Sequence, residues 1–152
     1  LLNLRRCFYK KTKFKRLQCN KSKALASNYR YISEYKDGFT GLFQHLTSDH
    51  FKSEGAELSR VSLLMEKLQY VKDKSARDFL MTMGINFQTL ALDTRIKNIF
   101  KHFGEHIPDT LSTKVYNATE KTIIDKICIP LDIEPVKFDR ILYQHYDKIV
   151  GK

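Results

Sequence analysis

Residues 74–96 read KSARDFLMTMGINFQTLALDTRI, and this stretch decides the fold. Its first half places apolar side chains three and four residues apart, at Ala76, Phe79, Leu80 and Met83. This spacing predicts a helix with one buried face that begins at an N-cap, Asp73. Gly84 is a typical helix stop, because glycine adopts the left-handed conformation without strain. A short loop then leads to Asp93, which predicts the N-cap of a second helix.

Helical spacing of apolar residues continues along most of the chain. It predicts further helices over residues 24–35, 39–47, 58–68, 115–129 and 135–150. Only six Gly and three Pro among 152 residues argue against a β fold built from many tight turns. We therefore expect an all-α fold, a helical bundle of about seven helices. Its expected core is the apolar stripe Phe79, Leu80, Met83, Ile96, Ile99 and Phe100.

The positive charge is concentrated at the beginning of the chain. The net charge is +10, and residues 1–33 contain ten basic residues and no acid, whereas residues 34–152 are balanced. We expect residues 1–23 to form a basic N-terminal arm or helix, and residues 24–152 to form the helical domain. Two interpretations of the arm stand equally: it neutralises DNA phosphates, or it is a solvated terminus.

The sequence predicts no membrane span, metal or cofactor. No apolar run approaches the roughly 20 residues that cross a bilayer, so we expect a cytoplasmic protein. We assume a monomer. Cys7, Cys19 and Cys128 form no CxxC pair, and the five His provide no convincing ligand set. Free thiols are therefore the expected state of the cysteines.

Lys74 and Asp93 are the residues of clearest chemical interest. Lys74 places an amine on the first turn of one expected helix, and Asp93 places a carboxylate at the start of the next. An amine nucleophile, with a carboxylate that steadies positive charge, is the pair needed to cleave a base–sugar bond. Taken singly, each residue has an ordinary explanation, as a solvated lysine and as a helix cap. The chemistry requires that both side chains face one cleft.

Two short elements of the sequence follow the order and spacing of a known family, and a third near residue 140 is similar to a pattern of that family. Residues 68–76 read LQYVKDKSA, residues 91–95 read ALDTR and residues 139–143 read DRILY. They resemble L-P-G-V-G-x-K-T-A, V-D-T-H and D-R-x-L-W of the helix-hairpin-helix DNA glycosylase superfamily, which includes endonuclease III and the archaeal-type 8-oxoguanine glycosylases. Tyr70 and Lys72 stand where the family's hairpin has its two glycines.

This resemblance implies a helical bundle with a helix-hairpin-helix motif and a DNA base-excision repair activity. The implied enzyme is a glycosylase with associated AP lyase activity on damaged bases, oxidised bases among the candidates. Its partner would be double-stranded DNA that contains a damaged base or an abasic site, which would make the protein nucleoid-associated. Lys74 and Asp93 match the catalytic lysine and aspartate of the family. The implied DNA contacts are Tyr70, Lys72, Ser75, Arg77 and Arg95.

Two alternatives remain open at this point. A non-catalytic helix-hairpin-helix DNA-binding module would keep the motif and the basic arm, and the replaced hairpin glycines favour it. An all-helical interaction protein without a nucleic-acid role is compatible with the balanced charge of residues 34–152.

Overall fold

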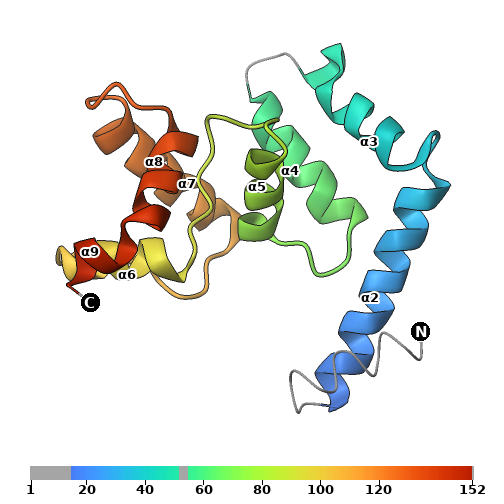
Figure 1. The fold of residues 1–152 in the computed structure, drawn as a ribbon, viewed down its shortest axis with the longest axis horizontal. Coiled ribbons are helices and arrows are strands. Elements are labelled where there is room, and N and C mark those ends of the chain that lie inside the picture. Colours follow the sequence, from blue (N-terminus) through green and yellow to red (C-terminus); the bar gives the residue numbers. More distant parts are fainter. Residues whose placement is uncertain (1–14, 52–54, 152) are drawn as a thin grey trace. The chain divides into compact units, whose positions relative to one another are not determined.

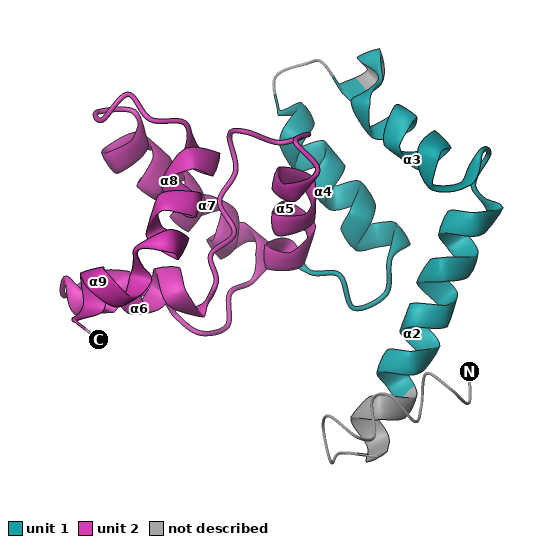
Figure 2. Cartoon of the chain, in the orientation of Figure 1, with its two compact units in different colours: residues 1–72 teal, residues 73–152 magenta. Residues whose placement is uncertain are grey.

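All regular secondary structure in the described part of the chain is helical (Figure 1). The computed structural model describes residues 15–51 and 55–151, and the predicted all-α class is confirmed for them. Within these ranges no helix has both the length and the apolar character that a membrane crossing demands. The chain divides into two compact units, Leu1–Lys72 and Asp73–Lys152 (Figure 2).

The described part of the first unit consists of helices joined by short turns. Its elements are α2 (Lys15–Glu34), α3 (Gly38–Thr47), the 3-10 turn η1 (Asp49–Phe51) and α4 (Ala56–Lys67). Helix α2 begins well before the predicted start at residue 24. The expected boundary between residues 23 and 24 therefore falls inside a continuous helix. The division between the two compact units falls after Lys72 in the sequence.

Two polar side chains fasten the elements of the first unit to one another. Arg60 of α4 donates to the Leu46 carbonyl at 2.7 Å and to the Phe51 carbonyl at 2.9 Å, which pairs two carbonyl groups at the ends of α3 and η1. Asn28 of α2 accepts a hydrogen bond from Gln69 N at 2.7 Å and donates one to Gln69 O at 2.9 Å. The turn after α4 is therefore held against α2.

The second unit begins with α5 (Asp73–Thr82), continues through an extended segment to α6 (Thr94–His102), and ends in a run of helices. These are α7 (Thr113–Ile123), the π-helical turn η2 (Ile124–Cys128), α8 (Pro135–Gln144) and α9 (Tyr146–Val150). Gly84 has a φ of 68° and follows the end of α5, as predicted. The helix predicted over residues 135–150 is interrupted at His145, so it forms two elements instead of one.

The core of the second unit joins the segment before α6 to α6, α7 and α8. Its buried members are Leu90, Leu92, Ile96, Ile99, Ile107, Tyr116, Ile123 and Leu142. Phe79 was expected in the core but is 37% exposed. The reason is that α5 turns Arg77 inward, and a residue two positions later lies about 160° away around the helix. The sequence had predicted that Arg77 lies on the exposed face of this helix, but it lies on the buried face.

Candidate active site

The extended segment Leu90–Leu92 leads into α6 and is fixed by side chains of α7 and α8. Its three backbone N–H groups donate in turn to Glu120 Oε1 at 2.7 Å, Asp139 Oδ2 at 2.9 Å and the Tyr116 hydroxyl at 2.7 Å. The Tyr116 hydroxyl also donates to Leu90 O at 3.0 Å. A buried N–H group without a partner costs about 1–3 kcal/mol, so these bonds fix the path of the segment. That path continues directly into Asp93.

Arg77 lies at the centre of a buried polar network in the second unit. It is 0% exposed, and its guanidinium donates to both oxygens of Glu120, at 2.9 and 2.8 Å, and to Asp73 Oδ1 at 3.0 Å. It also stacks on the Tyr116 ring, 4.3 Å from the ring centroid. Burial alone would lower the pKa of Arg77, but the hydrogen bonds and charge of Glu120 outweigh it and raise the pKa.

The position of Arg77 corrects the expectation that it contacts DNA. Its guanidinium is enclosed by Glu120, Asp73 and the side-chain oxygen of Asn117, which accepts a hydrogen bond at 2.6 Å. No part of the side chain reaches solvent, because position 77 lies on the buried face of α5 with Ala76 and Leu80. Arg77 is thus a structural residue that joins α5 to α7.

Glu120 joins the two segments that carry the predicted catalytic residues. It is 3% exposed, and its Oε1 accepts from both Arg77 of α5 and the backbone of Leu90. Helix α5 carries Lys74, and the segment that begins at Leu90 leads to Asp93. Sites on elements held in this way by packed, hydrogen-bonded neighbours keep their geometry better than sites on loops.

Asp93 is the N-cap of α6, as predicted. Its Oδ1 accepts hydrogen bonds from Arg95 N at 2.9 Å and from Ile96 N at 3.0 Å. The N-terminus of a helix carries a partial positive charge that favours an anion there. Both cap bonds end on Oδ1. The cap and the fixed segment together orient this carboxylate.

Lys74 lies on the first turn of α5, where its side chain is 44% exposed. Its Nζ is 3.3 Å from Asp78 Oδ2, one helical turn further on. The other oxygen of Asp78 is 3.8 Å from Arg140 Nη1 of α8, and Arg140 Nη2 donates to Thr82 Oγ1 at 2.9 Å. A row of charged groups therefore runs from the start of α5 to α8.

Asp139 is a buried carboxyl group next to this row. Burial is the main reason that its pKa rises to about 6, and the charges of Asp93 and Asp78 raise it further. The N–H group of Ala91 and the charge of Arg140 act in the opposite direction. Asp139 is joined directly to the segment that leads to Asp93, because its Oδ2 accepts the hydrogen bond of Ala91 N at 2.9 Å.

We call Lys74, Asp78, Asp93, Asp139 and Arg140 the charge cluster. It contains the two predicted catalytic residues and three residues for which the sequence had suggested no role. Within the described part of the chain, Lys74 pairs with Asp78 and Asp93 caps α6, and no hydrogen bond or ion pair joins Lys74 to Asp93. Two of the three, Asp139 and Arg140, open the DRILY string at residues 139–143, whose resemblance to a family pattern was the available signal. Asp78 is four residues after Lys74, a spacing that pairs opposite charges on a helix.

The remaining predicted DNA contacts are exposed. Lys72 follows α4 in the first unit, and Ser75 lies on the first turn of α5 in the second. Tyr70 is 57% exposed and has a φ of 63°, in the left-handed region that favours glycine. Tyr70 therefore adopts a backbone conformation that glycine takes without strain. Arg95 stacks on Tyr143 at 4.2 Å from the ring centroid, and hydrogen bonding to Tyr143 raises the pKa of Arg95.

A pocket of about 260 Å³ lies elsewhere in the second unit, beside η2. Its walls are formed by Gln88, Ile124, Cys128, Ile129, Asp132, Ile133, Glu134 and Pro135. These wall residues include no member of the charge cluster and no predicted DNA contact. Burial raises the pKa of the Cys128 thiol, which makes it a poor nucleophile at neutral pH.

No family model, no curated protein and no solved structure matches the chain.

Proposed function

We propose that the chain is a DNA base-excision repair glycosylase with associated AP lyase activity. The observation that most supports this proposal is the shared anchorage of Lys74 and Asp93. One buried residue, Glu120, holds both α5 and the segment that leads to Asp93. A nucleophile and a carboxylate that are far apart in the sequence are thus carried by elements with a common support.

In the proposed reaction, Asp93 acts as a carboxylate. It steadies the positive charge that develops on the sugar while the bond between C1′ and the base breaks, and the base leaves with a proton. The unprotonated amine of Lys74 forms a bond to C1′, and one of its two protons passes through Asp93 to the departing base. The second proton goes to O4′ as the C1′–O4′ bond opens and the imine forms. Loss of a proton from C2′ then expels the 3′ phosphate and nicks the strand.

Damaged DNA is the proposed partner, with the nucleotide turned out of the base stack so that its C1′ atom becomes accessible. The exposed residues Tyr70, Lys72, Ser75 and Arg95 remain the proposed contacts to the duplex. An oxidised base is the first substrate to test, because the DRILY string at residues 139–143 resembles a pattern of the archaeal-type 8-oxoguanine glycosylases.

A second candidate function is a DNA-binding module that does no chemistry. The observation in its favour is the ion pair between Lys74 Nζ and Asp78 Oδ2 at 3.3 Å. In such a module this pair would simply stabilise the first turn of α5, as opposite charges four residues apart do.

Reductive trapping separates the two candidates. The chain is incubated with borohydride and a duplex that contains either an abasic site or an oxidised purine. We expect a covalent protein–DNA product that Lys74→Gln abolishes, whereas Lys101→Gln, at an exposed position of α6, retains it. Binding to these duplexes without any trapped product or strand nicking would reject the enzyme and favour the binding module.

A further inference from the structure

We infer that the pocket beside η2 is a binding site for a small organic cation, an ammonium group carried on a compact apolar body. The pocket lies within the second unit, and its wall residues include no member of the charge cluster. Its volume of about 260 Å³ is below the roughly 300–1,000 Å³ of pockets that hold drug-sized ligands, so it suits a smaller molecule. The inference does not depend on the proposed function.

Three segments form the walls of the pocket, and backbone hydrogen bonds hold them together. The loop over residues 129–134 folds back on η2, where Ile133 N donates to the Cys128 carbonyl at 3.0 Å. At the start of α8, Val136 N donates to the Phe87 carbonyl at 3.1 Å, which holds the loop after α5 beside the other two segments. The pocket is therefore formed before any ligand binds, as most small-molecule sites are. The π-helical geometry of η2 agrees with this, because such turns occur frequently at functional sites.

The walls of the pocket are apolar at the base and mainly polar at the mouth. The buried and half-buried wall residues are all apolar: Ile124, Cys128, Ile133 and Pro135. The exposed wall residues are one isoleucine and three polar residues: Ile129, Gln88, Asp132 and Glu134. In a small-molecule site, apolar walls bury the body of the ligand and a few polar groups orient it. A ligand for this pocket therefore has an apolar body and one polar end.

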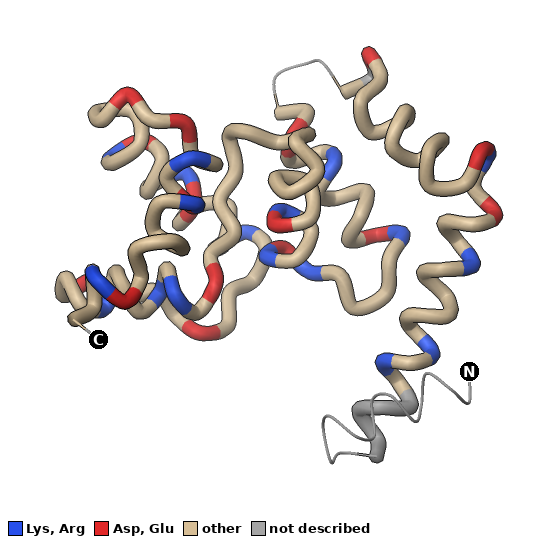
Figure 3. The backbone as a smooth tube through the Cα atoms, in the orientation of Figure 1, with Lys and Arg blue, Asp and Glu red and all other residues tan. Residues whose placement is uncertain are grey.

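The charge at the mouth of the pocket selects a cation for the polar end. Within the described residues no Lys or Arg forms part of the walls, and Figure 3 shows acidic positions on the loop that leads into α8. Glu134 Oε2 already pairs with Lys137 Nζ at 2.9 Å. The carboxylate of Asp132, by contrast, has no ion pair or hydrogen bond with any residue in the described part of the chain. An ammonium group beside Asp132 would neutralise this uncompensated charge.

Titration of the full chain with benzylamine, a cation at pH 7, tests the site. Isoleucine residues are labelled with carbon-13 in their δ1 methyl groups, and NMR follows the wall residues Ile124, Ile129 and Ile133. We expect their signals to shift and to saturate with a dissociation constant of about 1 mM or lower. The signals of Ile96 and Ile99, which lie in the core, should stay unchanged. If the wall signals show no saturable shift up to about 10 mM benzylamine, the site is refuted.

Three analogues test the charge and the source of the cation. Benzyl alcohol keeps the apolar body without a charge, and benzoate carries the opposite charge. We expect benzyl alcohol to bind about 3-fold more weakly than benzylamine, and benzoate more weakly still, because an exposed charge pair changes an affinity by about 1.5- to 5-fold. Equal affinities for benzylamine and benzyl alcohol would refute the preference for a cation. Acetyl-lysine methylamide offers an ammonium group on a peptide side chain and should bind several-fold more weakly than benzylamine, since its flexible stem loses rotamer freedom. Tighter binding of this analogue would overturn the assignment to a free amine.

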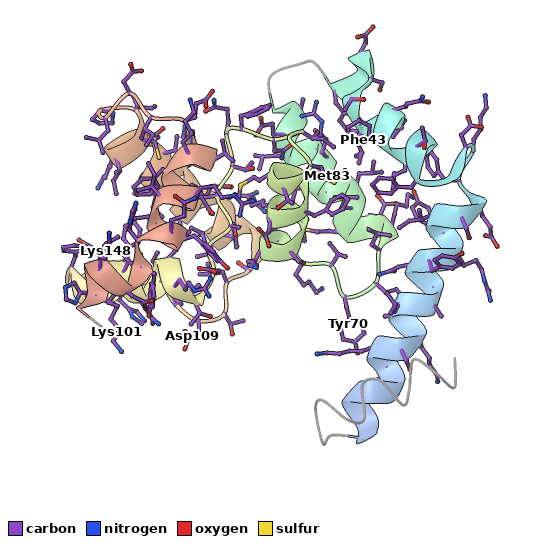
Figure 4. All side chains as sticks on the ribbon, viewed as in Figure 1. Phe43, Tyr70, Met83, Lys101, Asp109 and Lys148 are labelled. Carbon is purple, nitrogen blue, oxygen red and sulfur yellow. The ribbon has the colours of Figure 1, made fainter. Side chains whose placement is uncertain are left out.

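Asp132→Asn removes the charge at the mouth and keeps the turn. Asp132 has a φ of 50°, and asparagine is one of the few residues that adopt this left-handed conformation readily. We expect this variant to bind benzylamine about 3-fold more weakly and benzyl alcohol equally well. The matched control is Asp109→Asn, an exposed carboxylate that Figure 4 places at the opposite end of the second unit from the loop before α8. It should leave both affinities unchanged. Equal benzylamine affinities for the two variants would contradict the role of Asp132 and overturn the inference.

Discussion

Replacing Asp139 by Asn should stabilise the second unit at pH 8 and change little at pH 4. The pKa of about 6 in the folded protein lies above the ordinary value of 3.8, so the folded state holds this proton more tightly than the unfolded chain. The stability that the proton provides is complete below the unfolded pKa and is lost as the pH rises through about 6. A difference of about 2 pKa units corresponds to roughly 3 kcal/mol above that range, at 1.36 kcal/mol per unit.

The net gain from Asp139→Asn follows directly from this difference. The raised pKa already includes the hydrogen bond from Ala91 N, and the amide does not titrate. We therefore expect the variant to be about 2–3 kcal/mol more stable at pH 8, and within about 0.5 kcal/mol of the unmodified protein at pH 4.

Urea unfolding at both pH values measures the effect, and exchange of the Ala91 amide hydrogen reports on the second unit by itself. Carbon-13 NMR titration of the Asp139 carboxyl group should give a pKa near 6. The control is Asp125→Asn, an exposed carboxylate that pairs with Lys121 one helical turn away. If Asp139→Asn changed the free energy of unfolding equally at pH 4 and pH 8, the account of a raised pKa would be refuted.

Three further substitutions test the supports of the site. Glu120→Ala should lower the free energy of unfolding by about 3–5 kcal/mol in urea titrations, because it leaves the buried guanidinium of Arg77 without its main partner; a loss below about 1 kcal/mol would contradict the network. Tyr116→Phe should cost about 1–3 kcal/mol by the same measurement, since Leu92 N loses its acceptor, and unchanged exchange of the Leu92 amide would argue against that bond. Tyr70→Gly should be about 1 kcal/mol more stable than Tyr70→Ala, which keeps the left-handed strain; equal thermal unfolding midpoints would show that the strain is absent.

The features that sequence could predict were those with a local signal. Asp93 as a cap and Gly84 as a stop depend on backbone conformations within a few residues, and both were predicted correctly. Arg77 could not be placed in the same way. Its partner Glu120 is 43 positions away, and nothing near Arg77 in the sequence marks it as buried. Expectations based on polarity alone therefore put it on the surface and Phe79 in the core.

Asp139, a member of the charge cluster, also could not be assigned to the site from the sequence. The DRILY string at residues 139–143 was recognisable as a pattern, but its effect on the site depends on the pairing of Asp139 with Ala91, 48 positions away in the sequence. A carboxyl group is held there because the extended segment before α6 has a backbone N–H that α7 does not reach. Long-range hydrogen bonds to backbone groups carry no residue-specific signal on the backbone side, so a single sequence does not reveal them.

The ion pair between Lys74 and Asp78 is too weak to decide against catalysis. Both side chains are more than 40% exposed, and exposed pairs four residues apart on a helix contribute only about 0.3–0.5 kcal/mol. Opening the pair is therefore a small cost beside the roughly 8–23 kcal/mol by which enzymes lower the barriers of the reactions they catalyse. Arg140, 3.8 Å from the other oxygen of Asp78, keeps a cation beside this carboxylate when the lysine turns away. In the enzyme that we propose, this pair is the resting position of Lys74, and the amine leaves it to reach the sugar.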